Sequence, residues 1–183
     1  MIWLIVIIAI VVVIGIWLAR TYNSLVNLRN MAKDQWSQID VHLKRRADLI
    51  PNVVETVKGY ASHEKETLDA VITARNKAVS AGTVEEEMKA NGELTNALGR
   101  LFAVAEAYPD LKANTNFVDL QNTLKDTEDK IAFARQFYND AVLKYKNKLE
   151  MFPTNIVASM FGFKPELFFE ASGAEKEVPK VQF

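Results

Sequence analysis

Residues 2–19 read IWLIVIIAIVVVIGIWLA, a run of eighteen residues without a charged or strongly polar side chain. As an α-helix this run is about 27 Å long at ~1.5 Å per residue, close to the ~30 Å hydrocarbon core of a bilayer. Tryptophans lie near both ends, where amphipathic rings favour the membrane interface. The sequence therefore predicts a transmembrane anchor over residues 1–20, with Ile2, Trp3, Trp17 and Ala19 among the anchor residues.

A cleaved signal peptide is the alternative interpretation of this run. A signal peptide needs a basic region before the apolar stretch and small residues at its cleavage site. Here Ile2 follows Met1 directly, and bulky residues lie between Gly15 and Ala19. These features favour an anchor that the mature protein keeps.

Charged residues after the run predict its orientation. Six basic and two acidic residues lie between Arg20 and Arg46, whereas only the α-amino group precedes the run. Basic residues concentrate on the cytoplasmic side of membrane proteins. We therefore expect a single-pass protein with its N-terminus outside and its body in the cytoplasm.

The whole chain has a net charge of −1, with 22 basic and 23 acidic residues. This balance argues against nucleic-acid binding, which usually needs a basic face. The Lys44-Arg45-Arg46 cluster is the exception, and we interpret it as a solvated helix face. The chain has no cysteine, which excludes disulfides and thiol catalysis.

An apolar stripe with the α-helical period follows the anchor. Its ten steps cover 36 residues, or 3.6 residues per step. The stripe keeps its phase across Pro51, so we predict a kinked but continuous first helix that reaches about Val79 and stops at Gly82. The stripe consists of Leu25, Leu28, Ala32, Trp36, Ile39, Leu43, Ala47, Ile50, Val54, Val57 and Ala61.

Three further helices are predicted after Gly82. Thr83-Val-Glu-Glu86 matches the capping box that begins a helix, and Tyr108-Pro109-Asp110 ends it. A third helix runs from about Asn116 to Phe152-Pro153, and a short fourth covers Thr154–Phe161. The predicted fold is all-α: a transmembrane helix followed by an antiparallel up-and-down helical bundle over residues 21–163, with three long helices plus a short fourth.

Two apolar segments near the C-terminus leave alternatives open. Residues 164–183 are predicted to be an extended tail, whose apolar residues either pack back on the bundle or dock on a neighbouring chain. The segment Phe152–Phe163 either caps the end of the bundle or lies in the membrane interface.

Several long blocks of the chain closely resemble the LemA family, and the resemblance covers nearly the whole chain. It implies a bacterial single-pass protein of the inner membrane, with an outside N-terminus and a cytoplasmic helical bundle. It implies no catalytic activity, cofactor or ligand site. The blocks include Leu25–Asn30, Trp36–Val41, Asp48–Asn52, Ala97–Ala113, Lys130–Val142 and Met160–Pro165.

No residue pattern predicts catalysis. His42 and His63 lie 21 residues apart on the predicted first helix, so they cannot share a metal ion. The chain has no phosphate-binding glycine loop and no nucleophile elbow. We interpret the charges beside the stripes as interhelical salt bridges rather than as acid–base groups: Arg100, Glu106, Glu128, Arg135 and Asp140. We therefore predict no catalytic residue, no metal and no cofactor.

The predicted first helix is longer than the helices that could cover it. We therefore expect its membrane-proximal apolar residues to remain exposed, and exposed apolar strips often mark partner surfaces. The expected contact in a homo-oligomer comprises Leu25, Leu28, Trp36, Ile39 and Leu43 from this helix, and Phe168, Phe169 and Phe183 from the tail.

The functional prediction is a non-enzymatic, membrane-anchored helical scaffold that assembles with copies of itself beneath the inner leaflet. The alternative is an adaptor or regulator of another membrane protein, such as an envelope-stress protease. An enzyme or metal protein that uses the buried charges is a third class. The expected partners are the lipid bilayer, further copies of the chain and another membrane protein, without nucleic acid.

Overall fold

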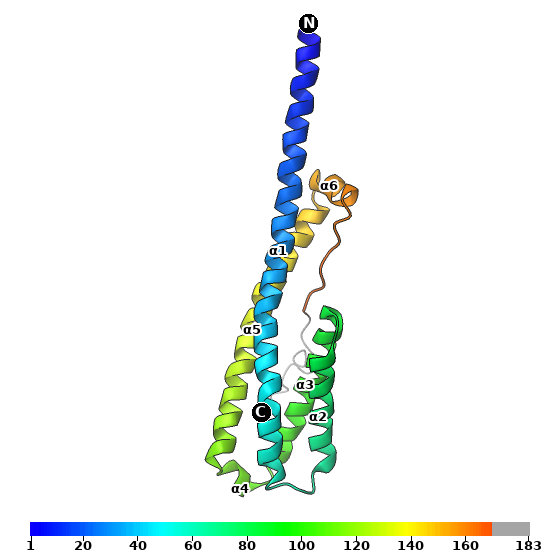
Figure 1. Cartoon of the computed structure of the whole chain (residues 1–183). Coiled ribbons are helices and arrows are strands. Elements are labelled where there is room, and N and C mark those ends of the chain that lie inside the picture. Colours follow the sequence, from blue (N-terminus) through cyan, green and yellow to red (C-terminus); the bar gives the residue numbers. More distant parts are fainter. Residues whose placement is uncertain (170–183) are drawn as a thin grey trace, which may run out of the picture. The chain divides into compact units, whose positions relative to one another are not determined.

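The computed structural model describes residues 1–169, and these residues form six helices and no strand (Figure 1). The all-α fold class is therefore confirmed. The helices are α1 (Ile2–Lys58), α2 (Lys65–Ser80), α3 (Val84–Ala105), α4 (Pro109–Lys112), α5 (Thr115–Glu150) and α6 (Thr154–Met160).

The chain divides into two compact units. Unit 1 contains residues 1–37 and 135–168, and unit 2 contains residues 38–134 together with Phe169. Both α1 and α5 contribute residues to each unit. The predicted anchor, bundle and tail were divided by changes of composition along the chain, whereas the two units are defined by which residues pack together.

Unit 1 is built on an antiparallel pair formed by α1 and α5. Leu25 of α1 packs against Tyr145 of α5, and the Trp36 ring lies 5.4 Å from the Tyr138 ring, edge to face. As residue numbers increase along α1, the residues of α5 that it contacts have decreasing numbers, so the two helices are antiparallel. Val157 and Ala158 of α6 complete the same cluster, so α6 closes one end of this pair.

Unit 2 has a larger core, to which α1, α2, α3, α4 and α5 contribute. The apolar stripe predicts its α1 side well, because Ile50, Val54 and Val57 are all buried. The members without solvent contact are Val53, Val57, Ala61, Val71, Leu94, Leu101 and Leu111.

The first helix is continuous through Pro51, as its phase predicts. The prediction that it reaches Val79 is wrong: α1 ends at Lys58, and a turn leads into α2. Glycine is a poor helix former, and the turn begins at Gly59. The amide N–H of Ala61 still donates to the Val57 carbonyl at 2.8 Å, and the Ala61 side chain is buried. The stripe therefore continues past the end of the helix that it seemed to define.

The predicted capping box at the start of α3 is confirmed. The Glu86 amide donates to Thr83 Oγ1 at 3.2 Å, and Glu86 Oε2 accepts from the Thr83 amide, also at 3.2 Å. This reciprocal pair satisfies two amide groups that the first turn of a helix leaves unbonded. The short helix α6 also lies where proline punctuation predicts it, directly after Pro153.

Candidate functional site

The predicted anchor residues lie in the apolar part of α1. Ile2, Trp3, Trp17 and Ala19 are all exposed in the structure. Among the described residues, α1 is the helix with a window long and apolar enough to cross a membrane, and none of that window is buried. The arrangement meets the length and composition that a membrane span requires.

The prediction that the first helix exposes its stripe in a single copy is wrong. Leu25, Ile39 and Leu43 are buried within one chain, and Leu28 is partly buried against the cluster of unit 1. The reason is that different helices cover different sections of α1. In unit 1 the cover comes from α5 and α6, and in unit 2 it comes from α2, α3 and α5. These side chains therefore offer little apolar surface for contact with another copy.

The remaining residues of the expected oligomer contact are also engaged. Trp36 is partly buried against Tyr138, Phe168 lies 5.8 Å from the Lys146 Nζ atom, and Phe169 is buried. Phe183 lies outside the described residues. The Tyr138 hydroxyl donates to the Leu167 carbonyl at 2.7 Å. As far as residue 169, the tail thus packs back on its own chain.

Unit 2 contains a buried arginine, Arg46 of α1, which is only 1% exposed. Its Nη1 atom lies 2.8 Å and 3.0 Å from the two Glu128 carboxylate oxygens on α5, and it also donates to Thr95 Oγ1 at 3.0 Å. Its Nη2 atom donates to Asn91 Oδ1 at 2.6 Å. One guanidinium group therefore joins α1, α3 and α5.

This arrangement corrects one sequence interpretation and confirms another. The Lys44-Arg45-Arg46 cluster is not a uniformly solvated face, because Arg46 points inward while Lys44 and Arg45 are exposed. Glu128, expected to form an interhelical salt bridge, does so with Arg46. A buried charge needs a partner with good geometry, and the planar guanidinium group supplies several donors to its neighbours at once.

A hollow of about 350 Å³ lies beside this network in unit 2. Its lining includes Asp40, Lys44, Arg75 and Glu87, so both signs of charge face it. Burial, together with the charge of Asp40 and a hydrogen bond to it, raises the pKa of Glu87 to about 7, although Lys44 opposes this shift. Glu87 therefore titrates near neutral pH, unlike an ordinary glutamate.

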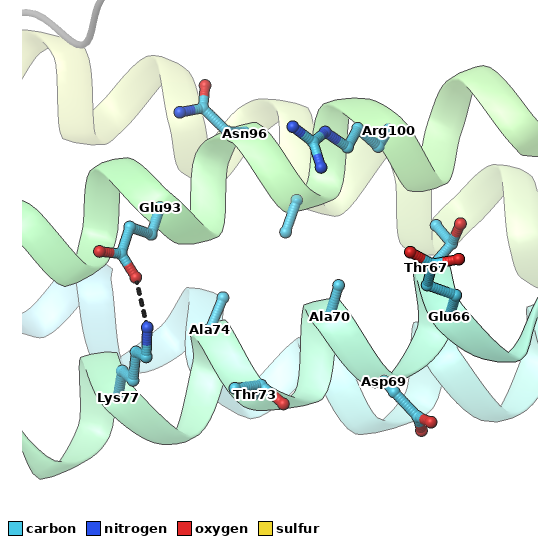
Figure 2. A pocket seen from close by; sticks show the side chains of 11 residues that line it. Glu66, Thr67, Asp69, Ala70, Thr73, Ala74, Lys77, Glu93, Asn96 and Arg100 are labelled. Carbon is cyan, nitrogen blue, oxygen red and sulfur yellow. Dashed lines mark hydrogen bonds and ion pairs between the residues drawn. The ribbon is translucent and has the colours of Figure 1, made fainter.

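A shallow groove of about 570 Å³ separates α2 from α3 in unit 2. Figure 2 shows Lys77 of α2 reaching across it to Glu93 of α3, with Nζ 2.9 Å from the carboxylate oxygen. Hydrogen bonding to Lys77 lowers the pKa of Glu93, so the carboxylate remains charged. Arg100, one of the charges considered from the sequence, also lines the groove. This surface carries a solvated ion pair.

The histidines and the other charges that the sequence singled out do not converge. His42 lies on α1, whereas His63 lies in the turn after it, so the prediction that they share one helix is wrong. Glu106 pairs with nearby Lys112 at the surface, and Asp140 is exposed. Residues 1–169 contain no group of three or more histidine, aspartate or glutamate residues arranged to hold a metal ion.

The sequence patterns did not predict the burial of Arg46 or the raised pKa of Glu87. A signal for Arg46 exists, because Ile39, Leu43, Arg46, Ile50 and Val53 are separated by four, three, four and three residues and all are buried. That spacing places Arg46 on the inward face of a helix. No such signal exists for Glu87, because its pKa depends on its burial in the folded chain and on Asp40, 47 residues earlier.

Replacing Arg46 by alanine is expected to lower the free energy of unfolding by about 3 kcal/mol, because Glu128 and Asn91 lose a buried partner. Chemical unfolding of the full chain in detergent, followed by circular dichroism, measures the change. The adjacent, exposed Arg45→Ala variant is the control, with an expected change within about 0.5 kcal/mol. Equal losses in the two variants would contradict the role given to Arg46.

The raised pKa of Glu87 predicts a pH dependence of stability. Folding favours protonated Glu87, so its contribution is fully present below the unfolded pKa of 4.5 and is lost as pH rises towards the folded value of about 7. Glu87→Gln keeps a neutral amide there, so its melting temperature should rise relative to wild type as pH goes from about 5 to 8. Exposed Glu85→Gln is the matched control. If the difference in melting temperature between wild type and Glu87→Gln does not change with pH, the raised pKa of Glu87 is refuted.

Comparison with known proteins shows the family to which this chain belongs. The sequence profile of the LemA family matches residues 35–183. The magnetosome proteins MamQ 1 and MamQ 2 of Paramagnetospirillum magneticum are each 28% identical over 183 aligned residues, covering 86% of this chain and 67% of the relative. Protein LemA of Metamycoplasma hominis is 27% identical over 157 residues, covering 84% of this chain and 71% of that protein. Since the profile spans most of the sequence, this chain belongs to the LemA family.

Proposed function

We propose that this protein is a non-enzymatic, membrane-anchored helical scaffold. Residues 2–19 of α1 span the bilayer with the N-terminus outside, and the helical bundle lies in the cytoplasm. The observation that carries this proposal is the apolar segment, of which no residue is buried and which continues in the same helix as the buried stripe.

The apolar segment is more stable in lipid than in water, because its side chains are apolar. Its large side chains, including Ile5, Val11 and Ile14, are exposed. Transfer of such side chains out of water is favourable by roughly 1.5–3 kcal/mol each. An α-helix also satisfies its own backbone hydrogen bonds, which the bilayer core demands.

Buried charge in unit 2 supports a structural role for the bundle. The Arg46 guanidinium group is bonded to residues of α3 and α5, so its donors fix helix positions. Charged pairs of this kind can specify one arrangement of helices over others. The bundle thus has the features of a rigid binding surface.

Exposed aromatic rings support self-assembly. On α5, Phe133 is 65% exposed and Phe137 is 60% exposed, one helical turn apart. Aromatic side chains at a protein surface are enriched at interfaces with other proteins. We propose that these rings, in place of the buried stripe of α1, contact a second copy of the chain.

The anchor is tested by deleting residues 2–19 and comparing membrane fractions after an alkaline wash. The full chain should stay with the membrane and the shortened chain should be released. Protease protection of tags at the two ends then reports orientation, with the C-terminal tag accessible only from the cytoplasmic side. Mass spectrometry of the full chain gives its N-terminus; loss of the first twenty residues would identify a cleaved leader and refute the anchor.

The scaffold is separated from the adaptor by light scattering of the same full chain in detergent. Self-assembly predicts a concentration-dependent mass that Phe133→Ser and Phe137→Ser reduce, whereas the half-exposed Val118→Ser control does not. A strictly monomeric chain would reject self-assembly. Co-purification of a different membrane protein in fixed proportion would then favour the adaptor.

A further inference from the structure

The turn from α5 into α6 carries a long uncharged segment. Residues 151–163, here named the α5–α6 corner, read MFPTNIVASMFGF and lie between Glu150 and Lys164. Thirteen residues without charge are unusual in a cytoplasmic bundle that is otherwise rich in charge. The corner belongs entirely to unit 1.

The corner has two faces with different environments. Thr154, Val157 and Ala158 are buried against the cluster of unit 1. On the other face, apolar side chains are exposed to more than half of their area: Met151, Phe152 (79%), Ile156 (55%), Met160 (59%) and Phe161. The first face caps the helix pair, as one of the two sequence interpretations expected, and the second stays more than half exposed although Phe161 contacts the Tyr22 ring.

The corner lies directly beside the end of the apolar segment of α1. Leu18, in the last turn of that segment, packs against the cluster that contains Val157. The Tyr22 ring lies 4.9 Å from the Phe161 ring and 5.5 Å from the Phe163 ring. Figure 1 shows α6 beside α1 at this level of unit 1. Tyr22 is only about 4.5 Å beyond Ala19 along a helix that rises ~1.5 Å per residue.

We propose that the exposed face of the α5–α6 corner lies in the interface of the same bilayer that holds α1. This inference rests on the proposed function, because it needs residues 2–19 to span the membrane. A segment held within one helical turn of the span then lies at the level of the lipid headgroups. Apolar faces of short helices bury ~5–10 Å into this region of a membrane.

Charges around the corner favour a lipid surface as its occupant. Arg20, Lys148 and Lys164 flank it, with Glu150 and Glu166 as the opposing charges. Arg29 lies over the Phe163 ring, with its guanidinium carbon 5.3 Å from the ring centre. Cationic residues near the cytoplasmic leaflet are attracted to anionic lipids. An uncharged apolar face with a cationic border thus matches a membrane surface better than a copy of itself, whose border would carry the same charges.

The absence of cysteine allows a direct depth measurement with single spin labels. The full chain, reconstituted in vesicles containing anionic lipid, carries a nitroxide at Met160→Cys or, separately, at Ile156→Cys. Val11→Cys reports the span, and exposed Ser62→Cys, in the turn after α1, reports water. Collision with oxygen, which concentrates in lipid, is compared with collision with a nickel chelate, which stays in water.

The labels at Ile156 and Met160 should show an oxygen-to-nickel collision ratio several-fold above that at Ser62, between the values for Ser62 and Val11. Ratios equal to that at Ser62, with Val11 still in lipid, would overturn this inference and leave the anchor intact. Low collision with both reagents would mean that protein, such as a second copy, covers the corner, which also overturns it. A water-exposed Val11 label would instead refute the proposed function. Thermal unfolding of each labelled variant confirms that it is folded, and agreement of the two corner labels guards against a local disturbance.

Discussion

Helix α1 runs unbroken from Ile2 to Lys58, and its continuity joins the apolar segment to both packed units. One helix of 57 residues contains an exposed apolar segment and then supplies buried residues to both units of the chain. Exposure of the apolar segment to water is unfavourable, and the apolar stripe that follows it needs neighbouring helices to cover it. If residues 2–19 lie in a bilayer, the segments packed on the helical turns just after Ala19 lie close to the membrane surface. The α5–α6 corner is one of these segments.

Neighbouring helices of the same chain cover the apolar stripe of α1. Because Leu25, Ile39 and Leu43 are buried within one chain, the stripe stabilises the fold rather than an assembly. In the described part of the chain, exposed apolar side chains are present at Phe133 and Phe137 of α5 and on the α5–α6 corner. Arg46 limits how the helices of unit 2 can rearrange, because any shift of α1 along α5 would separate its guanidinium group from Glu128.

Local patterns predicted much of this fold. The 3.6-residue stripe predicted the buried side of α1, Thr83 and Glu86 predicted the start of α3, and Pro153 predicted the break before α6. The missed features depend on contacts between distant parts of the chain. The turn at Gly59 was hidden because Ala61 keeps the phase of the stripe while outside the helix. The cover over Leu25 comes from Tyr145 and Val157, more than a hundred residues later, and the pKa of Glu87 depends on its burial and on Asp40. Single-sequence periodicity contains no information on either pairing.

Hydrogen exchange of the full chain in lipid vesicles, resolved by fragment mass spectrometry, tests most directly whether anchor and bundle share one unbroken helix. In a bilayer, the amide hydrogens of residues 2–19 would be shielded from water, and those of residues 20–36 are held in a helix that packs on α5 and α6. If α1 is one unbroken helix, exchange should be slow throughout residues 18–25, without a fast segment. Rapid exchange within those residues, between two protected regions, would show that a flexible link separates the apolar segment from the bundle.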